Sequence, residues 1–278
     1  MGVKPYSRTA ELKSFLENMG KGLPVPFELT GERKGIRMVT SSILILKVLQ
    51  REGLVFFPMR KFEYTYKGKK RIGIPGSIAV EGNTIFLDKQ YKKDAEDFQK
   101  SKARFGGIVI TTADAGHVNM LVLDKVKKTA SFFEPNGYTS KDVFISEPEK
   151  MVKKFLELYG LDDYTVKYDE SVCPFFGAQA VEGNAPRQTG YCQTWSQLFL
   201  YCKVHFPELD DVEIQAAFVE KRFPKEVRDM VERFAAFAWD KGEKDIEMYN
   251  EPGEENIMKL WFISCLPRKY KEAAMFEF

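Results

Sequence analysis

At 278 residues the chain suits one large domain, or a core domain with a smaller appendage. Its apolar share of 44% and charged share of 29% are ordinary for a globular protein, and a net charge of +2 does not by itself indicate a nucleic-acid partner. The longest apolar run is too short to span a bilayer and the N-terminus lacks an apolar signal segment, so we expect neither a membrane protein nor a secreted one.

The N-terminal residues 1–95 are expected to form a separate unit with helices and strands. Apolar spacing predicts helices over residues 9–20, capped by Thr9, and over residues 40–53, each ended by a glycine. Residues 55–76 and 77–88 are predicted to form β-strands, the second run with a hairpin at the Glu-Gly-Asn of residues 81–83. The charged stretch 89–105 is either a linker helix or the first helix of the next domain.

The remaining residues, 96–278, alternate between strand and helix signals. Strands are expected at 106–114, and at 117–125 and 128–135 as a hairpin. Next we expect a helix with Ser146 and Glu149 as its capping box and Gly160 at its end, and then a strand within residues 162–171. An irregular Gly- and Pro-containing stretch leads into a buried helix over 192–206, and the C-terminal part is mostly helical, including residues 254–266. This order indicates an α+β fold.

Cysteine usage indicates free thiols in a reducing compartment. Four cysteines (Cys173, Cys192, Cys202 and Cys265) in a chain of this length do not resemble a disulfide framework. With only two histidines and no closely spaced cysteine pair, we expect no metal and no other cofactor. The compartments that fit are the cytosol, the nucleus and a virion interior.

Cys192 is placed where an irregular segment turns into the predicted buried helix. Free N–H groups and the partial positive charge of a helix start favour a thiolate and can bind a developing oxyanion. The competing interpretation is a small apolar side chain in the core. Cys202, in the middle of that helix on its apolar face, is expected to be core.

A catalytic cysteine needs an imidazole, and elimination leaves His117. His205 lies thirteen residues after Cys192 on the same predicted helix, roughly 20 Å away at 1.5 Å per residue. His117 opens a predicted strand, which suits a residue at the end of a sheet.

The orienting residue is narrowed by strand geometry. Asp124 lies seven residues along the strand from His117, roughly 23 Å away, and is read as a solvated charge at the turn. The return strand brings Asn136 level with His117 if Lys125 pairs with Lys128, and Glu134 if the loop is two residues longer. Both candidates face the same side, and both stay open.

Three stretches carry a resemblance to a known family: "GHVNMLVLD", "SFFEPNG" and "GYCQTWS". Their order and spacing over residues 106–206 resemble the cysteine protease superfamily of SUMO-specific proteases and the adenovirus maturation protease, adenain. Residues 1–95 in front are similar in organisation to the arm of large-DNA-virus polyprotein proteases, such as that of African swine fever virus. The resemblance implies an adenain/SUMO-protease-like core over 96–278, a central mixed β-sheet flanked by helices.

The resemblance also implies a role for each candidate residue. Cys192 is the nucleophile, His117 the base and Glu134 the orienting acid, with Asn136 as the alternative because the African swine fever virus enzyme uses an asparagine. Gln188 is the candidate for the oxyanion hole. It lies four residues before Cys192, whereas the family has this glutamine six or seven before, so Gln179 and Asn184 are substitutes.

The implied activity is that of a cysteine endopeptidase, a monomer in the virion or host cytoplasm. It would cleave viral polyprotein or capsid precursors, after Gly-Gly-type sites, during virion maturation. Val118 stands where the family usually has the tryptophan that narrows the Gly-Gly tunnel, which weakens assignment as a deubiquitinase or SUMO-specific isopeptidase. An acetyltransferase with the same His-Glu-Cys order and a catalytically dead binding scaffold are two further functions compatible with the sequence.

A basic cluster within residues 60–71 suggests an activator. It consists of Arg60, Lys61, Lys67, Lys69, Lys70 and Arg71. Such a cluster fits a DNA activator, or the polar surface of a solvated hairpin. A peptide activator is the other partner expected beside the protein substrate.

Overall fold

The computed structural model describes residues 5–23, 44–58, 62–73, 77–112, 117–137, 145–168, 177–182, 191–247 and 271–277. The chain forms two compact units. The helical unit comprises Met1–Leu49, Glu134–Val143 and Asp169–Glu251, and the sheet unit comprises Gln50–Phe133, Phe144–Tyr168 and Pro252–Phe278. The expected division between residues 1–95 and 96–278 is not a boundary between these units, because residues on both sides of it belong to the sheet unit.

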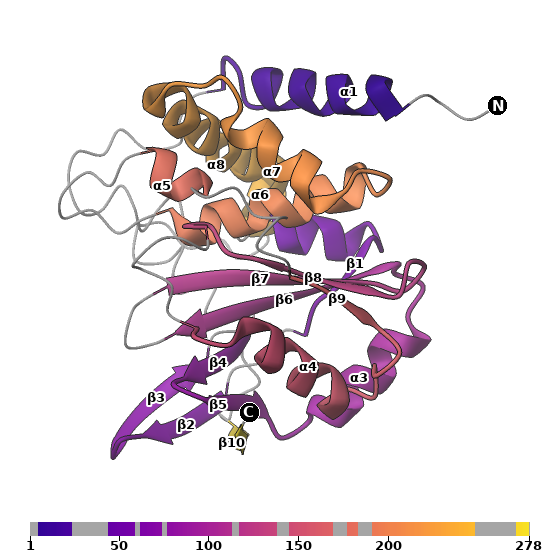
Figure 1. Ribbon diagram of the computed structural model, residues 1–278, viewed down its shortest axis with the longest axis vertical. Helices are drawn as coiled ribbons and strands as arrows, with labels where there is room; N and C mark the ends of the chain where they lie inside the picture. The colour runs from indigo at the N-terminus through magenta and orange to yellow at the C-terminus, as the bar shows by residue number, and fades with distance from the viewer. Residues whose placement is uncertain are drawn as a thin grey trace. The chain divides into compact units, whose positions relative to one another are not determined.

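Ten strands of the described residues form one mixed sheet in the sheet unit (Figure 1). They are β1 (Val55–Phe56), β2 (Phe62–Tyr66), β3 (Lys69–Gly73), β4 (Ser77–Glu81), β5 (Thr84–Asp88), β6 (Phe105–Thr112), β7 (His117–Asp124), β8 (Thr129–Phe133), β9 (Thr165–Lys167) and β10 (Lys271–Glu277). The order is β3-β2-β10-β5-β4-β6-β7-β8-β9, with β1 also paired to β6. The β4–β6, β8–β9, β2–β10 and β1–β6 pairs are parallel, and the others are antiparallel.

Two helices, α3 (Tyr91–Lys100) and α4 (Pro148–Leu158), pack against this sheet. Phe98 of α3 and Phe155 of α4 belong to one core with alternate residues of the central strands, such as Ile108 and Leu121. Complete burial of such a side chain contributes about 2–3 kcal/mol. All eight residues of β7 are buried, so this strand is covered on both faces. The chain is therefore α+β, with a mixed central sheet flanked by helices.

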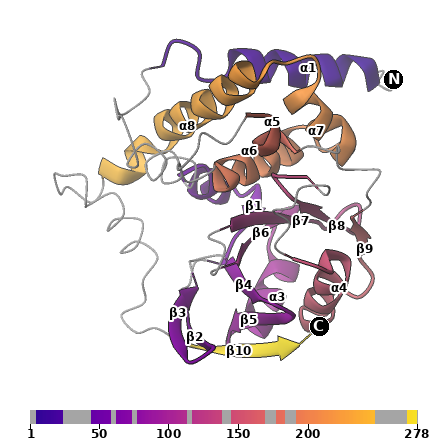
Figure 2. The same cartoon turned by 60° about the vertical axis from the view of Figure 1, so that its left-hand side comes forward.

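The helical unit contains α1 (Pro5–Asn18), the greater part of a helix over residues 44–51, α5 (Ala178–Glu182), α6 (Cys192–His205), α7 (Asp211–Val219) and α8 (Pro224–Glu247) (Figure 2). Contacts between these helices include a hydrogen bond from Arg233 of α8 to the carbonyl of Leu16 in α1, at 3.0 Å. Gly242 of α8 meets Leu44 so closely that a Cβ there would lie 2.5 Å from the Cβ of Leu44. Close helix approach of this kind is a packing use of glycine.

The side chains of α6 are buried on nearly every side of the helix. Trp195, Leu198, Phe199 and Cys202 are fully buried, as their three- and four-residue spacing predicts. The Trp195 ring lies 5.5 Å from that of Phe218 in α7. Because the polar residues between them are buried as well, α6 is a central helix of its unit rather than a surface helix.

Several local predictions need correction. Thr9 lies inside α1 rather than at its start, and α4 has Glu147 at its N-cap with no side-chain cap, because Pro148 at the first position begins the helix. The short helix α5 lies in a stretch expected to be irregular, and β10 lies in a stretch expected to be mostly helical. The helix expected over residues 254–266 lies outside the described residues.

Candidate functional site

Cys192 is the first residue of α6, as the sequence predicts, and its side chain is buried. It is not in a disulfide. The N-cap residue, Tyr191, makes no side-chain hydrogen bond to the helix start. The free N–H groups at the start of a helix can bind a developing oxyanion. The local setting of Cys192 therefore suits a nucleophile.

Cys202 offers a contrast on the same helix. Its side chain is fully buried, as expected for a core residue, and this burial raises the pKa of the thiol well above its ordinary value. A thiol kept protonated in an apolar core is unreactive. Of the two described cysteines, Cys192 alone has the setting of a nucleophile, whereas Cys173 and Cys265 lie outside the described residues.

His117 is the first residue of β7, at the end of the strand as expected, and is 4% exposed. It pairs with Thr112 of β6, whose hydroxyl donates to the His117 carbonyl at 3.4 Å. The ring Nε2 lies 3.5 Å from the side-chain amide of Asn119, at the outer limit of a hydrogen bond. Asn119 was not singled out from the sequence, although a position two residues along a strand shares the face of His117.

His205 ends α6 with an exposed side chain that stacks on Tyr201, the ring centroids 4.2 Å apart. Its place at the far end of the helix from Cys192 agrees with its exclusion as the base.

The β7–β8 register is the one that sets Lys125 opposite Lys128. Asp124 pairs with Thr129 and Met120 with Phe133, so the register matches the alternative that places Asn136 level with His117. The pairing ends at Phe133, however, one residue before Glu134. Glu134 then accepts the Asn136 backbone N–H on its carboxylate at 2.9 Å, and its carbonyl accepts the Gly137 N–H at 3.1 Å. The chain turns here, so strand register no longer distinguishes the two candidates.

Asp124 is buried rather than solvated, which corrects its expected role. Its carboxylate accepts two hydrogen bonds from Arg104, at 2.7 and 3.0 Å, and also the backbone N–H groups of Val126 and Lys127. Burial alone would raise the pKa of Asp124, but these hydrogen bonds and the Arg104 charge outweigh it and lower the pKa. Asp124 thus fixes the hairpin turn, at the opposite end of β7 from His117.

The segment Glu134–Gly137 is bound to α5. The Gly177 N–H donates to the Asn136 carbonyl and the Gln179 N–H to the Pro135 carbonyl, both at 3.0 Å. A Cβ at Gly177 would lie 2.1 Å from the Pro135 oxygen, so only glycine fits this approach.

α5 is in turn bound to the start of α6. Glu182, the last residue of α5, accepts a hydrogen bond from the Trp195 indole at 2.7 Å, and both side chains are buried. Glu134, Asn136 and Cys192 therefore belong to one connected unit, whereas His117 belongs to the sheet unit. Sequence reasoning missed Glu182, because its partner lies thirteen residues further along and no motif joins them.

Of the candidates for the oxyanion hole, only Gln179 is described. It lies in α5, is buried, and its Oε1 has no hydrogen-bond partner among the described residues. Gln188 and Asn184 lie outside the described residues.

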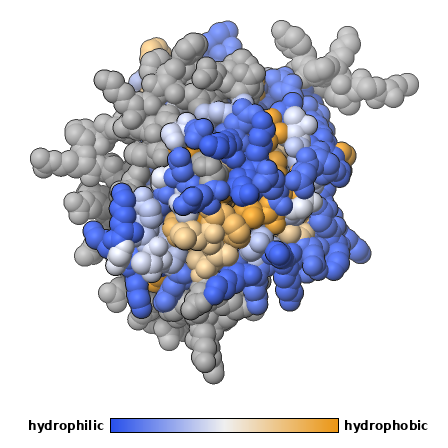
Figure 3. All heavy atoms as spheres, turned by 60° about the horizontal axis from the view of Figure 1, so that its bottom comes forward, coloured by the Kyte–Doolittle hydropathy of each residue, from blue (hydrophilic) through white to orange (hydrophobic). Residues whose placement is uncertain are grey.

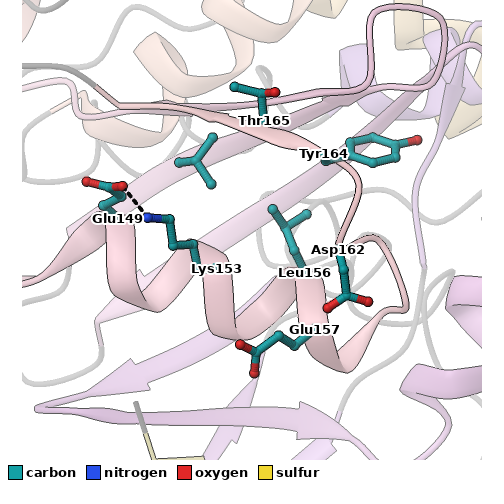
Figure 4. Close-up of a pocket in the computed structure, with 8 residues that line it drawn as sticks. Glu149, Lys153, Leu156, Glu157, Asp162, Tyr164 and Thr165 are labelled. Atoms are coloured by element: carbon teal, nitrogen blue, oxygen red, sulfur yellow. Dashed lines mark ion pairs between the residues drawn. The ribbon is translucent and has the colours of Figure 1, made fainter.

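Two surface pockets of the described residues lie in the sheet unit, and no candidate catalytic residue lines either. The first lies between α4 and β9 (Figure 4), with an ion pair of 2.6 Å between Glu149 and Lys153. The second is lined by residues of β2, β5 and β10, including Phe86 and Met275. Seen from the bottom of Figure 1, apolar side chains form a patch among hydrophilic ones (Figure 3).

Within the described ranges, no group of three or more histidine, cysteine or acidic residues is arranged to hold a metal ion. No helix there has the length and apolar character to cross a membrane. Of the basic cluster, Lys67 to Arg71 lie on the β2–β3 hairpin, whereas Arg60 and Lys61 lie outside the described residues.

Comparisons with models of protein families, with curated proteins and with solved structures found no match to this chain.

Proposed function

We propose that this chain is a cysteine endopeptidase whose nucleophile is Cys192. The observation that carries the proposal is the place of Cys192 as the first residue of a buried helix, in the same compact unit as the Glu134–Gly137 segment. A thiolate at a helix start attacks the scissile carbonyl and forms an acyl-enzyme, which water then hydrolyses. The amine of the first product leaves with a proton from the base.

The proposal assigns the base to His117, since the other histidine, His205, stands at the far end of α6. Glu134 orients the imidazole in this proposal, with Asn136 as the alternative. The oxyanion binds to the Cys192 N–H and to a side-chain amide. Gln188 is the amide that the family resemblance favours, and Gln179, buried in α5, stays a substitute.

The substrate class rests on the family resemblance. It indicates a viral polyprotein or capsid precursor, cut after Gly-Gly-type sites during virion maturation, with the enzyme in the virion or host cytoplasm. Val118 after the base histidine favours this over a ubiquitin-like tail. Activation by DNA or a peptide belongs to the same proposal, with the β2–β3 hairpin as the basic surface.

The test is a turnover assay with the purified full chain, Cys192→Ala and the matched control Cys202→Ala. Gly-Gly-X peptides should be cleaved by the wild type and by Cys202→Ala, and not by Cys192→Ala. The same proteins are given ubiquitin-like conjugates and, separately, acetyl-CoA with an acceptor peptide. Turnover of these alone would indicate an isopeptidase or an acetyltransferase, and no turnover at all would indicate a binding scaffold. Peptide cleavage that survives Cys192→Ala would overturn the mechanism.

A further inference from the structure

Glu182 is a buried carboxyl that the proposed mechanism does not use. It is 3% exposed, and two N–H groups donate to its carboxylate: the Trp195 indole, at 2.7 Å, and the backbone N–H of Tyr191. Tyr191 directly precedes Cys192, and Trp195 lies three residues after it. One carboxylate therefore binds the first turn of α6 on both sides of the proposed nucleophile.

The backbone of Glu182 is itself bound by a side chain of α8. Arg228 of α8 donates to the Glu182 backbone carbonyl at 2.8 Å, so the last residue of α5 is held from a second helix. Glu232, one turn further along α8, accepts from the Tyr191 hydroxyl at 3.5 Å. The residue before Cys192 is thus held through its backbone by Glu182 and through its side chain by Glu232.

We propose that Glu182 is a positioning residue, whose carboxylate holds the first turn of α6 and with it the Cys192 thiol. This inference rests on the proposed function, since it concerns the same nucleophile. In its ionised form the carboxylate accepts both N–H groups strongly, because hydrogen bonds to a charged acceptor are about twice as strong as neutral ones. Protonation weakens both bonds and loosens the turn.

Protonation of Glu182 falls within the neutral pH range. Burial is the main cause that raises the pKa of Glu182 to about 7, and the charge of Glu232 also raises it. The hydrogen bond from Trp195, the positive charge of Arg228 and the hydrogen bond from the Tyr191 N–H lower the pKa, but they do not outweigh burial. Tyr191 does not titrate in this range, since burial and the two glutamates raise its pKa to about 12. The acidic residues of α7 are engaged elsewhere, Asp211 with Lys203 and Glu213 with Thr9.

The first test follows the Trp195 indole N–H in a ¹H–¹⁵N spectrum of the wild-type full chain from pH 5.5 to 8.5. Trp195→Phe identifies the resonance among those of the three tryptophans. The resonance should titrate with a midpoint near 7, and it should not titrate in Glu182→Gln, which keeps the shape of the side chain without its ionisation. A Trp195 resonance that is constant across this range in the wild type would overturn the proposal, even if Glu182→Gln does not fold.

The second test compares wild type and Glu182→Gln by the rate at which iodoacetamide alkylates Cys192, read by mass spectrometry, and by kcat and KM. The ratio of the wild-type rate to the Glu182→Gln rate should be near one at pH 5.5, where the side chain at position 182 is neutral in both proteins. It should rise to about tenfold at pH 8, the effect of one charge-assisted hydrogen bond, with KM unchanged. A ratio independent of pH would contradict the positioning role. Alkylation needs no peptidase activity, so failure of the proposed function and failure of this inference give different results.

Discussion

The backbone N–H of Gly177 donates to the carbonyl of Asn136 at 3.0 Å, and there is no room for a side chain at Gly177. This contact joins the segment with both candidate orienting residues to α5, and α5 continues to Glu182 and the start of α6. The position of the Glu134–Gly137 segment therefore depends on a glycine that performs no chemistry.

Replacing Gly177 by alanine should destabilise this junction. The new Cβ would lie 2.1 Å from the Pro135 oxygen, and since that atom is backbone, one of the two segments must move. We expect a loss of about 2–3 kcal/mol in the free energy of unfolding, measured in urea, and a larger relative loss of peptidase activity. Gly22→Ala is the matched control: at φ +80° with open space around it, strain alone should cost about 1 kcal/mol. Equal costs for the two variants would argue against a steric origin.

The identity of the orienting residue should emerge from Glu134→Ala and Asn136→Ala. We expect Glu134→Ala to lower kcat/KM by about 10²–10⁴-fold, as loss of the group that orients a catalytic imidazole does. Asn136→Ala should cost far less, because its backbone N–H, which binds Glu134, is retained. The measurement is peptide turnover at fixed pH, with thermal unfolding to show that both variants fold. The reverse order of effects would make Asn136 the orienting residue.

Stability should fall between pH 4.5 and 7 because of Glu182. Its pKa is about 7 in the folded chain against an ordinary 4.5, so the folded state holds the proton more tightly. The resulting stabilisation is fully present below pH 4.5 and is lost as the pH rises through 7, by an amount on the order of 3 kcal/mol. Glu182→Gln should lack this loss, and the exposed-site control Glu208→Gln should retain it. Urea unfolding at pH 5 and pH 8 measures the difference, and identical profiles for wild type and Glu182→Gln would refute it.

The two described thiols should differ in reactivity. At pH 7.5, iodoacetamide should modify Cys192 in the native chain, whereas Cys202 should react only after unfolding, because burial raises its pKa and excludes the reagent. Mass spectrometry of peptides after timed labelling, with and without urea, checks this. Native labelling of Cys202 as fast as that of Cys192 would mean that α6 opens readily.

The Arg104–Asp124 pair should stabilise the fold at neutral pH and lose this effect on acidification, the reverse of the pH dependence expected for Glu182. The lowered pKa of Asp124 means that its contribution is present above the ordinary value of 3.8 and is lost as the pH falls through the folded pKa. Asp124→Ala should cost about 2 kcal/mol at neutral pH, because it leaves Arg104 without its partner and the turn without its acceptor. Its cost should shrink on acidification. An unchanged cost at low pH would show that the charge is not involved.

Local signals in the sequence predicted the parts of the fold that depend on neighbouring residues. The start of α6 at Cys192 and the start of β7 at His117 follow from periodicity. Turn position left two β7–β8 registers open, and the structure has the one that sets Lys125 opposite Lys128. The β4–β5 hairpin formed where its glycine indicated, with Gly82 at φ +57°.

The elements that were missed depend on distant partners. The residues of β10, "KEAAMFE", include good helix formers, and their extended form comes from pairing with β2 and β5, which lie far earlier in the chain. α5 is a five-residue helix stabilised by contacts with Pro135 and Trp195 rather than by propensity. Glu182 was overlooked for the same reason, since a buried hydrogen bond between separate helices leaves no local pattern.

The position of β10 has a consequence for synthesis. β10 alone connects β2 to β5 in the order of the described strands, parallel to one and antiparallel to the other. On the ribosome, the β2–β3 pair and the strands β5-β4-β6-β7-β8-β9 are made long before β10. The nascent chain therefore carries two sheet fragments, each with an open hydrogen-bonding edge. Completion of the sheet must wait until residues 271–277 emerge, and a chain released before that point would keep two edges open to another chain.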